Sequence, residues 1–153
     1  MKVCILGDGL TSLTLAQAIV NLGINVDVVY QKKIKKYNKS RTLGISENNV
    51  KFYNENILKI QKILWEIKKI EIYTDNLKNE KILDFEKKNK NLFSVVKNYE
   101  LYELLLSSLK KNKFFNFKKD KKNKFYLNKN YNLIINCDQN HLLTKKIFFK
   151  KIK

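Results

Sequence analysis

Several residue types are scarce in this chain: its 153 residues include no proline, four glycines, two cysteines, one histidine and one arginine. Two cysteines cannot staple a small domain with several disulfides, and we expect both to be reduced thiols. One histidine, with no second histidine or cysteine pair near it, argues against a structural metal site. These scarcities exclude disulfide-rich and metal-stapled folds.

Long hydrophobic runs are also missing. No apolar run approaches the roughly 18 residues of a membrane-spanning helix, and the apolar start is interrupted by Gly7, Asp8 and Gly9. The start also lacks the basic segment and small-residue cleavage site of a secretory signal. We therefore expect a cytoplasmic protein, with peripheral membrane contact left open.

Apolar residues make up 44% of the chain, which is enough to bury a core and excludes a disordered or collagen-like protein. The length is that of one ordinary domain. Since no internal repeat or linker divides the sequence, we predict a single domain over residues 1–153.

The charge is strongly one-sided: 32 basic against 14 acidic residues give a net charge of +18. Such a basic chain is typical of nucleic-acid binding. Only Arg41 is an arginine, however, and proteins that read phosphates and bases favour the bidentate guanidinium. Abundant lysine and asparagine without proline match the codons of an AT-rich genome. We therefore interpret the charge as a lysine-coated, solvated surface that includes the runs at 32–36, 118–124 and 145–153.

The first thirty residues carry the pattern of a complete β-α-β unit. Residues 2–6 form an apolar run typical of a buried parallel strand, and residues 24–30 form a second one. Between them lie a Gly-Asp-Gly turn and an apolar-periodic helix over 13–22, followed by Gly23 where a helix C-cap belongs. This order predicts an α/β fold.

The turn after the first strand has the spacing of a dinucleotide-binding fingerprint, G-x-G-x-x-G, with Ser12 in the third position. Gly7 would make the tight turn, and Gly9 would let a pyrophosphate approach the backbone. The anion would then bind the N–H groups of Leu10, Thr11 and Ser12 at the positive end of the helix. The alternative is a tight turn that binds nothing.

One part of the dinucleotide pattern is missing. The second strand should end in an acidic residue that receives the ribose hydroxyls, but it ends in Tyr30 and Gln31. Gln31 is the nearest polar substitute, and neither residue offers a charge-assisted hydrogen bond. Asp27 comes two to three residues too early in the strand. We keep Tyr30 and Gln31 as candidate cofactor-binding residues.

The rest of the chain alternates helical and strand patterns. Apolar residues at near-helical spacing predict an amphipathic helix over 47–66. Its aromatic residues Phe52, Tyr53 and Trp65 are expected in the core. A second helix is predicted over 100–109. Strand-like segments, separated by Asn- and Lys-rich turns, lie at 69–74, 81–85, 92–96, 114–117, 124–127 and 131–136.

Residues 3–16, Val-Cys-Ile-Leu-Gly-Asp-Gly-Leu-Thr-Ser-Leu-Thr-Leu-Ala, resemble the opening of FAD-dependent aromatic-ring monooxygenases of the p-hydroxybenzoate hydroxylase type. Within this family, the hydroxylases of ubiquinone biosynthesis are the most similar. The resemblance continues in order through Arg41-Thr-Leu-Gly-Ile-Ser46, Asn98-Tyr-Glu-Leu-Tyr-Glu-Leu-Leu-Leu106 and Leu133-Ile-Ile-Asn-Cys-Asp138. The last segment departs from the family's Asp-Gly motif, because Gln139 takes the place of the glycine.

The resemblance implies an FAD cofactor, reduced by NAD(P)H, and a small aromatic or quinone-like substrate. It adds Arg41, Asn98 and Asp138 to the FAD-binding residues and assigns no catalytic side chain, because the flavin does the chemistry. A lone arginine in a lysine-rich chain independently indicates a site that needs planar, bidentate bonding. Family members are much longer, so the chain resembles an N-terminal FAD-binding portion, with a separate chain as one source of the remainder.

These patterns together predict a Rossmann-like FAD-binding fold with a central parallel sheet. Because β-α-β crossovers are right-handed, strand 2–6 should lie between strands 24–30 and 132–137. The two cysteines would then lie on adjacent strands without being bonded. A small antiparallel sheet from 69–96, on the substrate side, should pack beside the parallel sheet.

A basic binding module without catalysis is the alternative interpretation, with nucleic acid or an anionic surface as its partner. Aromatic residues interleave with lysines in the tail, as in a single-strand stacking platform: Phe114, Phe115, Phe117, Phe125 and Tyr126. The same alternation is typical of buried strand positions, and no RNA-binding motif is present. We therefore prefer the flavoprotein interpretation and regard nucleic acid as a disfavoured partner.

Overall fold

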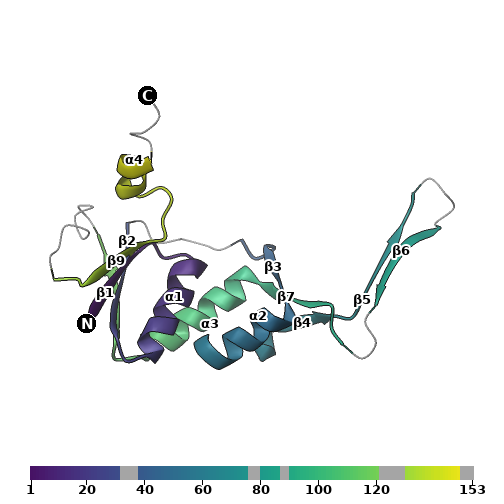
Figure 1. The fold of residues 1–153 in the computed structure, drawn as a ribbon, viewed down its shortest axis with the longest axis horizontal. Helices are drawn as coiled ribbons and strands as arrows, with labels where there is room; N and C mark the ends of the chain where they lie inside the picture. Colours follow the sequence, from purple (N-terminus) through teal and green to yellow (C-terminus); the bar gives the residue numbers. More distant parts are fainter. Residues whose placement is uncertain (32–37, 76–79, 87–89, 121–129, 149–153) are drawn as a thin grey trace. The chain divides into compact units, whose positions relative to one another are not determined.

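The computed structural model describes residues 1–31, 38–75, 80–86, 90–120 and 130–148. The chain forms two compact units: Met1–Asn38 together with Leu101–Lys153, and Lys39–Glu100. Figure 1 shows the elements of each unit. Whether the two units make one domain over residues 1–153 stays a prediction.

The first unit is built on a parallel sheet whose described strands follow the order β8-β2-β1-β9. The strands are β1 (Lys2–Leu6), β2 (Asn25–Tyr30), β8 (Phe115–Lys119) and β9 (Leu133–Asn136). The helices are α1 (Leu10–Asn21), most of α3 (Asn98–Lys110) and α4 (Leu142–Phe148). The predicted α/β fold, with β1 between β2 and β9, is therefore confirmed.

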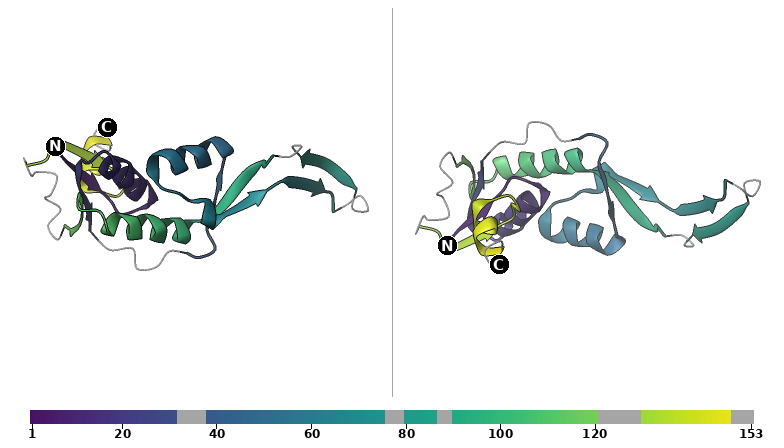
Figure 2. Two further views of the ribbon diagram at one scale, coloured as in Figure 1. Left: turned by 90° about the horizontal axis from the view of Figure 1, so that it is seen from below. Right: turned by 90° about the horizontal axis from the view of Figure 1, so that it is seen from above.

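Alternation along the strands divides the side chains of this sheet between two faces. On one face Val3, Ile5 and Val28 are fully buried, and α1 and α3 lie on that side (Figures 1 and 2). A smaller core cluster forms on the opposite face: Cys4, Leu6, Val29, Tyr131, Ile134 and Leu143. Both faces of the sheet are thus covered, as the apolar character of the strands predicts.

The strand β8 belongs to the parallel sheet, a position that the sequence pattern did not predict. The apolar residues at 114–117 predict a strand, and the structure pairs it in parallel with β2, from Val26 opposite Phe115 to Tyr30 opposite Lys119. Phe115 is only 9% exposed, so the aromatic alternation here is that of a buried strand. The aromatics at 125 and 126 lie outside the described residues.

The second unit contains two small antiparallel sheets. One has the order β3-β7-β4, formed by β3 (Thr42–Ile45), β7 (Phe93–Lys97) and β4 (Leu64–Ile67). The other is the hairpin of β5 (Lys69–Tyr73) and β6 (Lys81–Glu86), which Figure 2 shows as a two-stranded ribbon. The strands predicted within 69–96 are present. Their predicted union in one sheet is wrong, because β7 pairs with β3 and β4 instead of β6.

The predicted helix over 47–66 is too long. The α-helix α2 (Glu47–Phe52) continues as a π-helical turn (Tyr53–Ile57) and stops at Leu58, whose backbone is extended. A short 3₁₀ turn (Gln61–Ile63) leads into β4. The apolar spacing at 63–67 fits a helix and a strand equally well, and pairing with β7 decides for the strand.

Two aromatic side chains that we predicted in the core are exposed, so that part of the prediction is wrong. Phe52 is 55% exposed and Trp65 is 62% exposed. The strand geometry at 64–67 replaces the helical face on which Trp65 was expected. Its ring instead lies 5.0 Å from the ammonium group of Lys97, a cation–π contact.

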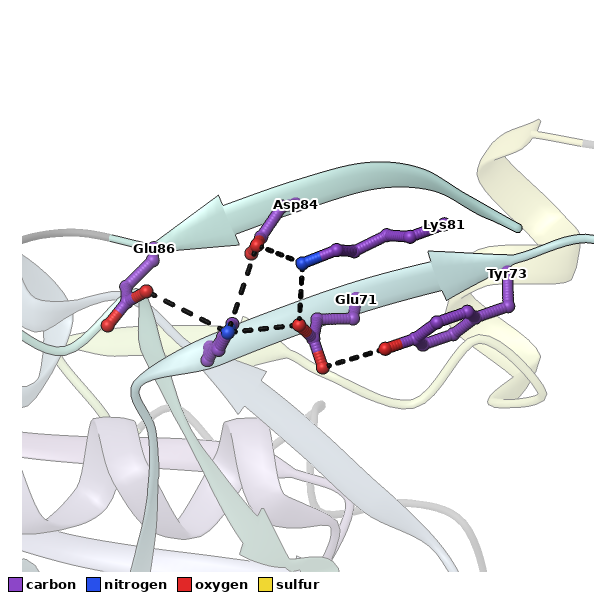
Figure 3. A network of polar contacts seen from close by, with 6 residues as sticks. Glu71, Tyr73, Lys81, Asp84 and Glu86 are labelled. Carbon is purple, nitrogen blue, oxygen red and sulfur yellow. Dashed lines mark hydrogen bonds and ion pairs between the residues drawn. The ribbon is translucent and has the colours of Figure 1, made fainter. Parts of the chain in front are cut away.

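The β5–β6 hairpin carries an ionic network on one face (Figure 3). Lys69 Nζ lies 2.9 Å from Glu71 Oε1, and Lys81 Nζ lies 3.0 Å from the same oxygen and 2.7 Å from Asp84 Oδ2. The Tyr73 hydroxyl donates to Glu71 Oε2 at 3.2 Å. Hydrogen bonds from Lys69 and then Lys81 lower the pKa of Glu71 to about 2. The network therefore joins the two strands of a hairpin that has no third strand beside it among the described residues.

Candidate functional site

The turn after β1 requires a glycine at position 7. Its φ is +107°, a conformation that side-chain-bearing residues rarely adopt, and its N–H donates to the Val29 carbonyl at 2.8 Å. A Cβ added there would come within 3.2 Å of Ser12 Oγ and of Asp138 Cβ. The turn is thus fixed between β2, the start of α1 and the segment after β9. This geometry brings together Gly7, Ser12 and Asp138, three of the predicted cofactor-binding residues.

Gly9 differs from Gly7, because neither its backbone conformation nor its surroundings require a glycine. Its backbone is extended (φ −76°, ψ 178°) at the N-cap of α1, and a Cβ added there would meet no atom within 4 Å. The first N–H groups of α1, at Leu10, Thr11 and Ser12, have no partner within the helix. No side chain caps this end, and no acidic residue lies in the first turn of α1. An anion could therefore approach the positive end of the helix over Gly9.

Two predicted cofactor-binding residues carry buried polar atoms without a hydrogen bond in the described part of the chain, Gln31 Nε2 and Asn98 Oδ1, and so do Gln17 Oε1 and Thr74 Oγ1, which have no predicted cofactor role. Buried polar atoms in folded proteins nearly always have a partner, and each exception calls for an explanation such as a bound water or ligand. Ser12 lies at the start of α1 and is only 1% exposed, and a hydrogen bond between its side chain and Cys137 partly offsets the effect of burial on the pKa of that thiol. Gln31 belongs to the first unit and Asn98 to the second, so each is a candidate contact by itself.

The carboxyl end of β2 lacks the acidic residue that binds the ribose in a typical dinucleotide fold. The Tyr30 ring stacks on Phe117, with centroids 4.6 Å apart, so it is engaged in packing against β8. Gln31 follows directly, with the unpaired amide nitrogen described above. Asp27 lies further back in β2 and is fully buried, with its carboxylate already hydrogen-bonded to Lys118 and Tyr131. Of the two predicted residues, Gln31 therefore offers the available polar group.

Arg41 and Asn98 belong to the second unit, where β3 and β7 begin and end next to each other. The Asn98 N–H donates to the Arg41 carbonyl at 2.9 Å. The Arg41 side chain is exposed, whereas Asn98 Oδ1 is buried. The sequence resemblance gives each of these residues as a candidate FAD-binding residue, and this hydrogen bond joins their backbones.

The Asp138 carboxylate is occupied within its own turn. Its Oδ1 accepts the Asn140 N–H at 2.9 Å, and its main-chain carbonyl accepts the Thr144 hydroxyl at 3.0 Å. The exposed Gln139 stands where the family has glycine. Asp138 therefore touches the glycine turn through its backbone and Cβ, a packing role that the motif alone did not predict.

Asp8 is a charged residue of the turn to which sequence reasoning gave no role. It is only 8% exposed. Burial and the nearby Asp8 carboxylate raise the pKa of the Tyr102 hydroxyl to about 12. Its position between Gly7 and Gly9 was the signal that could have found it. A negative charge at this turn weakens the binding of an anion at the start of α1.

Both cysteines are free thiols, as predicted. Cys4 lies in β1, and the N–H of Cys137 donates to the Leu6 carbonyl at 2.9 Å, just after β9. Burial, followed by the charges of Asp27 and Asp120, raises the pKa of Cys4 to about 11. Burial also raises the pKa of Cys137. Neither thiol has the lowered pKa of a nucleophile.

The described residues give little evidence for a metal site, a membrane-spanning helix or a nucleic-acid stacking site. Within them, no group of three or more histidine, cysteine, aspartate or glutamate side chains could hold a metal ion. No helix among them is both long enough and apolar enough to cross a membrane. Of the aromatics proposed for nucleic-acid stacking, Phe115 is buried and Phe117 is stacked on Tyr30. The structure thus leaves the glycine turn as the best-formed candidate site.

Comparisons with known proteins agree on the fold. No protein-family model matches the chain, and no curated protein matches it by sequence. Solved structures of similar fold include p-nitrophenol 4-monooxygenase PnpA from Pseudomonas putida (TM-score 0.63, 13% identity). Another is 2,6-dihydroxypyridine-3-hydroxylase from Arthrobacter nicotinovorans (TM-score 0.56, 16% identity). A third is the flavin-dependent monooxygenase PieE, solved in complex with FAD and substrate (TM-score 0.62, 10% identity).

The similarity extends over most of this chain but over a minor part of those proteins. It covers 76% of this chain and 31% of PnpA, 76% of this chain and 28% of the dihydroxypyridine hydroxylase, and 78% of this chain and 24% of PieE. The structural neighbours are therefore FAD-dependent aromatic monooxygenases, of which this chain spans less than a third. At these identities the similarity establishes the fold.

Proposed function

We propose that this chain forms the FAD-binding part of a flavin-dependent monooxygenase that hydroxylates an aromatic ring. The observation that carries the proposal is the Gly7–Ser12 turn: the space over Gly9 is open, and α1 presents its positive end there. The fold shared with solved flavin-dependent monooxygenases supports the same assignment.

Each proposed residue has a defined task toward FAD. Gly7 shapes the turn, and Gly9 leaves room for the pyrophosphate against the backbone. The N–H groups at the start of α1 donate to phosphate oxygens, while Arg41 offers a bidentate cation and Asn98 a buried amide. When bound, FAD reduced by NAD(P)H supplies the activation of oxygen for insertion into the ring.

The substrate class and the setting are finer parts of the proposal. By its sequence resemblance, we assign a prenylated quinone precursor as the aromatic substrate. Such a substrate partitions into membranes, so we place the chain in the cytoplasm with peripheral membrane contact through its lysine-rich surface. The chain spans less than a third of the length of these structural neighbours, and we propose for it the FAD-binding part of the reaction.

The proposal is tested by titrating FAD into the purified chain and following flavin absorbance and fluorescence. Gly9→Asp places a side chain and a negative charge where the pyrophosphate would lie, so we expect at least a tenfold loss of affinity. Asn21→Asp is the matched control, because it adds the same charge at the opposite end of α1. A wild-type chain that binds no FAD, or a Gly9→Asp variant that binds as well as Asn21→Asp, would overturn the proposal.

A further inference from the structure

The missing acid at the end of β2 leaves the ribose of a bound dinucleotide without its usual acceptor, and the structure supplies one from another strand. The residue after β8 is Asp120, and its N–H donates to the Tyr30 carbonyl at 2.9 Å. Because β8 runs parallel to β2, both strands end at the same edge of the sheet. Asp120 therefore occupies, in space, the neighbourhood in which a dinucleotide fold carries its ribose-binding acid.

The glycine turn and Asp120 flank the last residues of β2 from its two sides. The Gly7 N–H donates to the Val29 carbonyl, and the Asp120 N–H donates to the next carbonyl, that of Tyr30. A nucleotide whose pyrophosphate lies on the glycine turn extends its ribose along this edge toward the end of β2. The acceptor required there is thus held in register by a backbone hydrogen bond.

Gln31 supplies a hydrogen-bond donor near the Asp120 carboxylate. Continuing the parallel register of Tyr30 opposite Lys119 places Gln31 opposite Asp120. Asp120 is 4% exposed, and Gln31 Nε2 is buried without a hydrogen bond in the described part of the chain. One residue brings a carboxylate that accepts hydrogen bonds, and the other brings an amide that can donate one.

We propose that Asp120 and Gln31 together bind the ribose 2′,3′-diol of the adenosine half of the cofactor. Each hydroxyl of a vicinal diol can donate to the carboxylate and accept from the amide, whereas a phosphate at this place would be repelled by Asp120. The pair therefore selects an unphosphorylated adenosine ribose, as in FAD. This inference rests on the proposed function, because it requires a dinucleotide on the Gly7–Ser12 turn.

The test compares calorimetric binding of ADP and 2′-deoxy-ADP, which differ in one hydroxyl. We expect the wild-type chain to bind ADP about tenfold more tightly than 2′-deoxy-ADP, since a hydrogen bond to a carboxylate is lost. In Asp120→Asn the preference should fall below about twofold. Asp75→Asn, an exposed aspartate of the second unit, is the matched control and should keep the full preference.

Gln31→Leu gives a second reading that does not disturb Asp120, and we expect an intermediate preference of about threefold. Circular dichroism spectra equal to those of the wild type show that each variant is folded. A full preference retained by both folded variants, or a wild-type chain that binds both nucleotides equally, overturns the diol assignment and leaves FAD binding standing. A wild-type chain that binds neither ADP nor FAD overturns the proposed function as well.

Discussion

Asp27 should be the most sensitive charged position in the first unit. Its carboxylate is fully buried in β2 and accepts hydrogen bonds from the Tyr131 hydroxyl at 2.6 Å, Lys118 Nζ at 2.8 Å and Asn116 Nδ2 at 3.1 Å. Lys2 Nζ lies 3.2 Å away. Four segments, β1, β2, β8 and the residues before β9, thus meet at one carboxylate, including a lysine from a run that the sequence placed on the solvated surface.

The substitution Asp27→Asn keeps the volume and removes the charge. Losing one member of a buried ion pair costs about 3–5 kcal/mol. The side chains of Lys2 and Lys118 are 39% and 38% exposed and can return to water, so we expect the low end, about 3 kcal/mol. For a chain of this size, that lowers the midpoint of thermal unfolding by roughly 6–12 °C. Asp75→Asn, at an exposed position, should change stability by less than about 0.5 kcal/mol.

The stability difference between the wild type and Asp27→Asn should depend on pH in a defined direction. Burial alone would raise the pKa of Asp27, but hydrogen bonds from Lys118, Tyr131 and Lys2 outweigh it, and the pKa lies below the ordinary 3.8. A lowered folded-state pKa stabilises the protein above the unfolded value, and this contribution is lost as the pH falls through the folded value. The difference between wild type and Asp27→Asn should therefore be full at pH 7 and shrink below about pH 3.8. Equal stability at pH 7, or a difference that grows in acid, would refute the reasoning.

Three further predictions concern the glycine turn and β8. Gly7→Ala should destabilise the chain by about 2 kcal/mol because of its positive φ and crowded Cβ, whereas Gly9→Ala should cost less than about 1 kcal/mol; equal losses in urea unfolding would contradict the assigned geometry. Phe115→Ala should cost about 3 kcal/mol in thermal unfolding, as a core residue does; a folded, equally stable variant that loses RNA binding at ~150 mM salt would favour the nucleic-acid interpretation instead. Asp8→Asn should tighten ADP binding about threefold by calorimetry, since it removes a buried negative charge from the turn; unchanged or weaker binding would separate this carboxylate from the anion site.

Local signals account for what the sequence predicts well. The first β-α-β unit is visible because apolar runs, two glycines and a helix stop follow each other within thirty residues. The place of β1 between β2 and β9 follows from the handedness of crossovers. These features depend on near neighbours along the chain or on a general rule of topology, so no tertiary information is needed.

Features that depend on strand pairing between distant segments cannot be predicted from the sequence pattern. The strand at 64–67 has a spacing that suits a helix, and only its partner β7 decides otherwise. Asp120 lies about ninety residues from Tyr30 along the chain, and the parallel pairing of β2 and β8 alone brings them together. Likewise, the unpaired atom of Gln31 is recognisable only once its surroundings are folded. The glycine turn is therefore predictable from the sequence, and the proposed ribose contact at Asp120 and Gln31 is not.

Competition between FAD and ADP for the purified wild-type chain tests the central claim most directly. The claim is that the Gly7–Ser12 turn and the adjoining sheet edge bind the adenosine diphosphate half of the cofactor. We predict saturable FAD binding with one flavin per chain, measured by fluorescence, and full displacement of FAD by excess ADP. FAD that does not bind, or bound FAD that excess ADP leaves in place, would contradict the account.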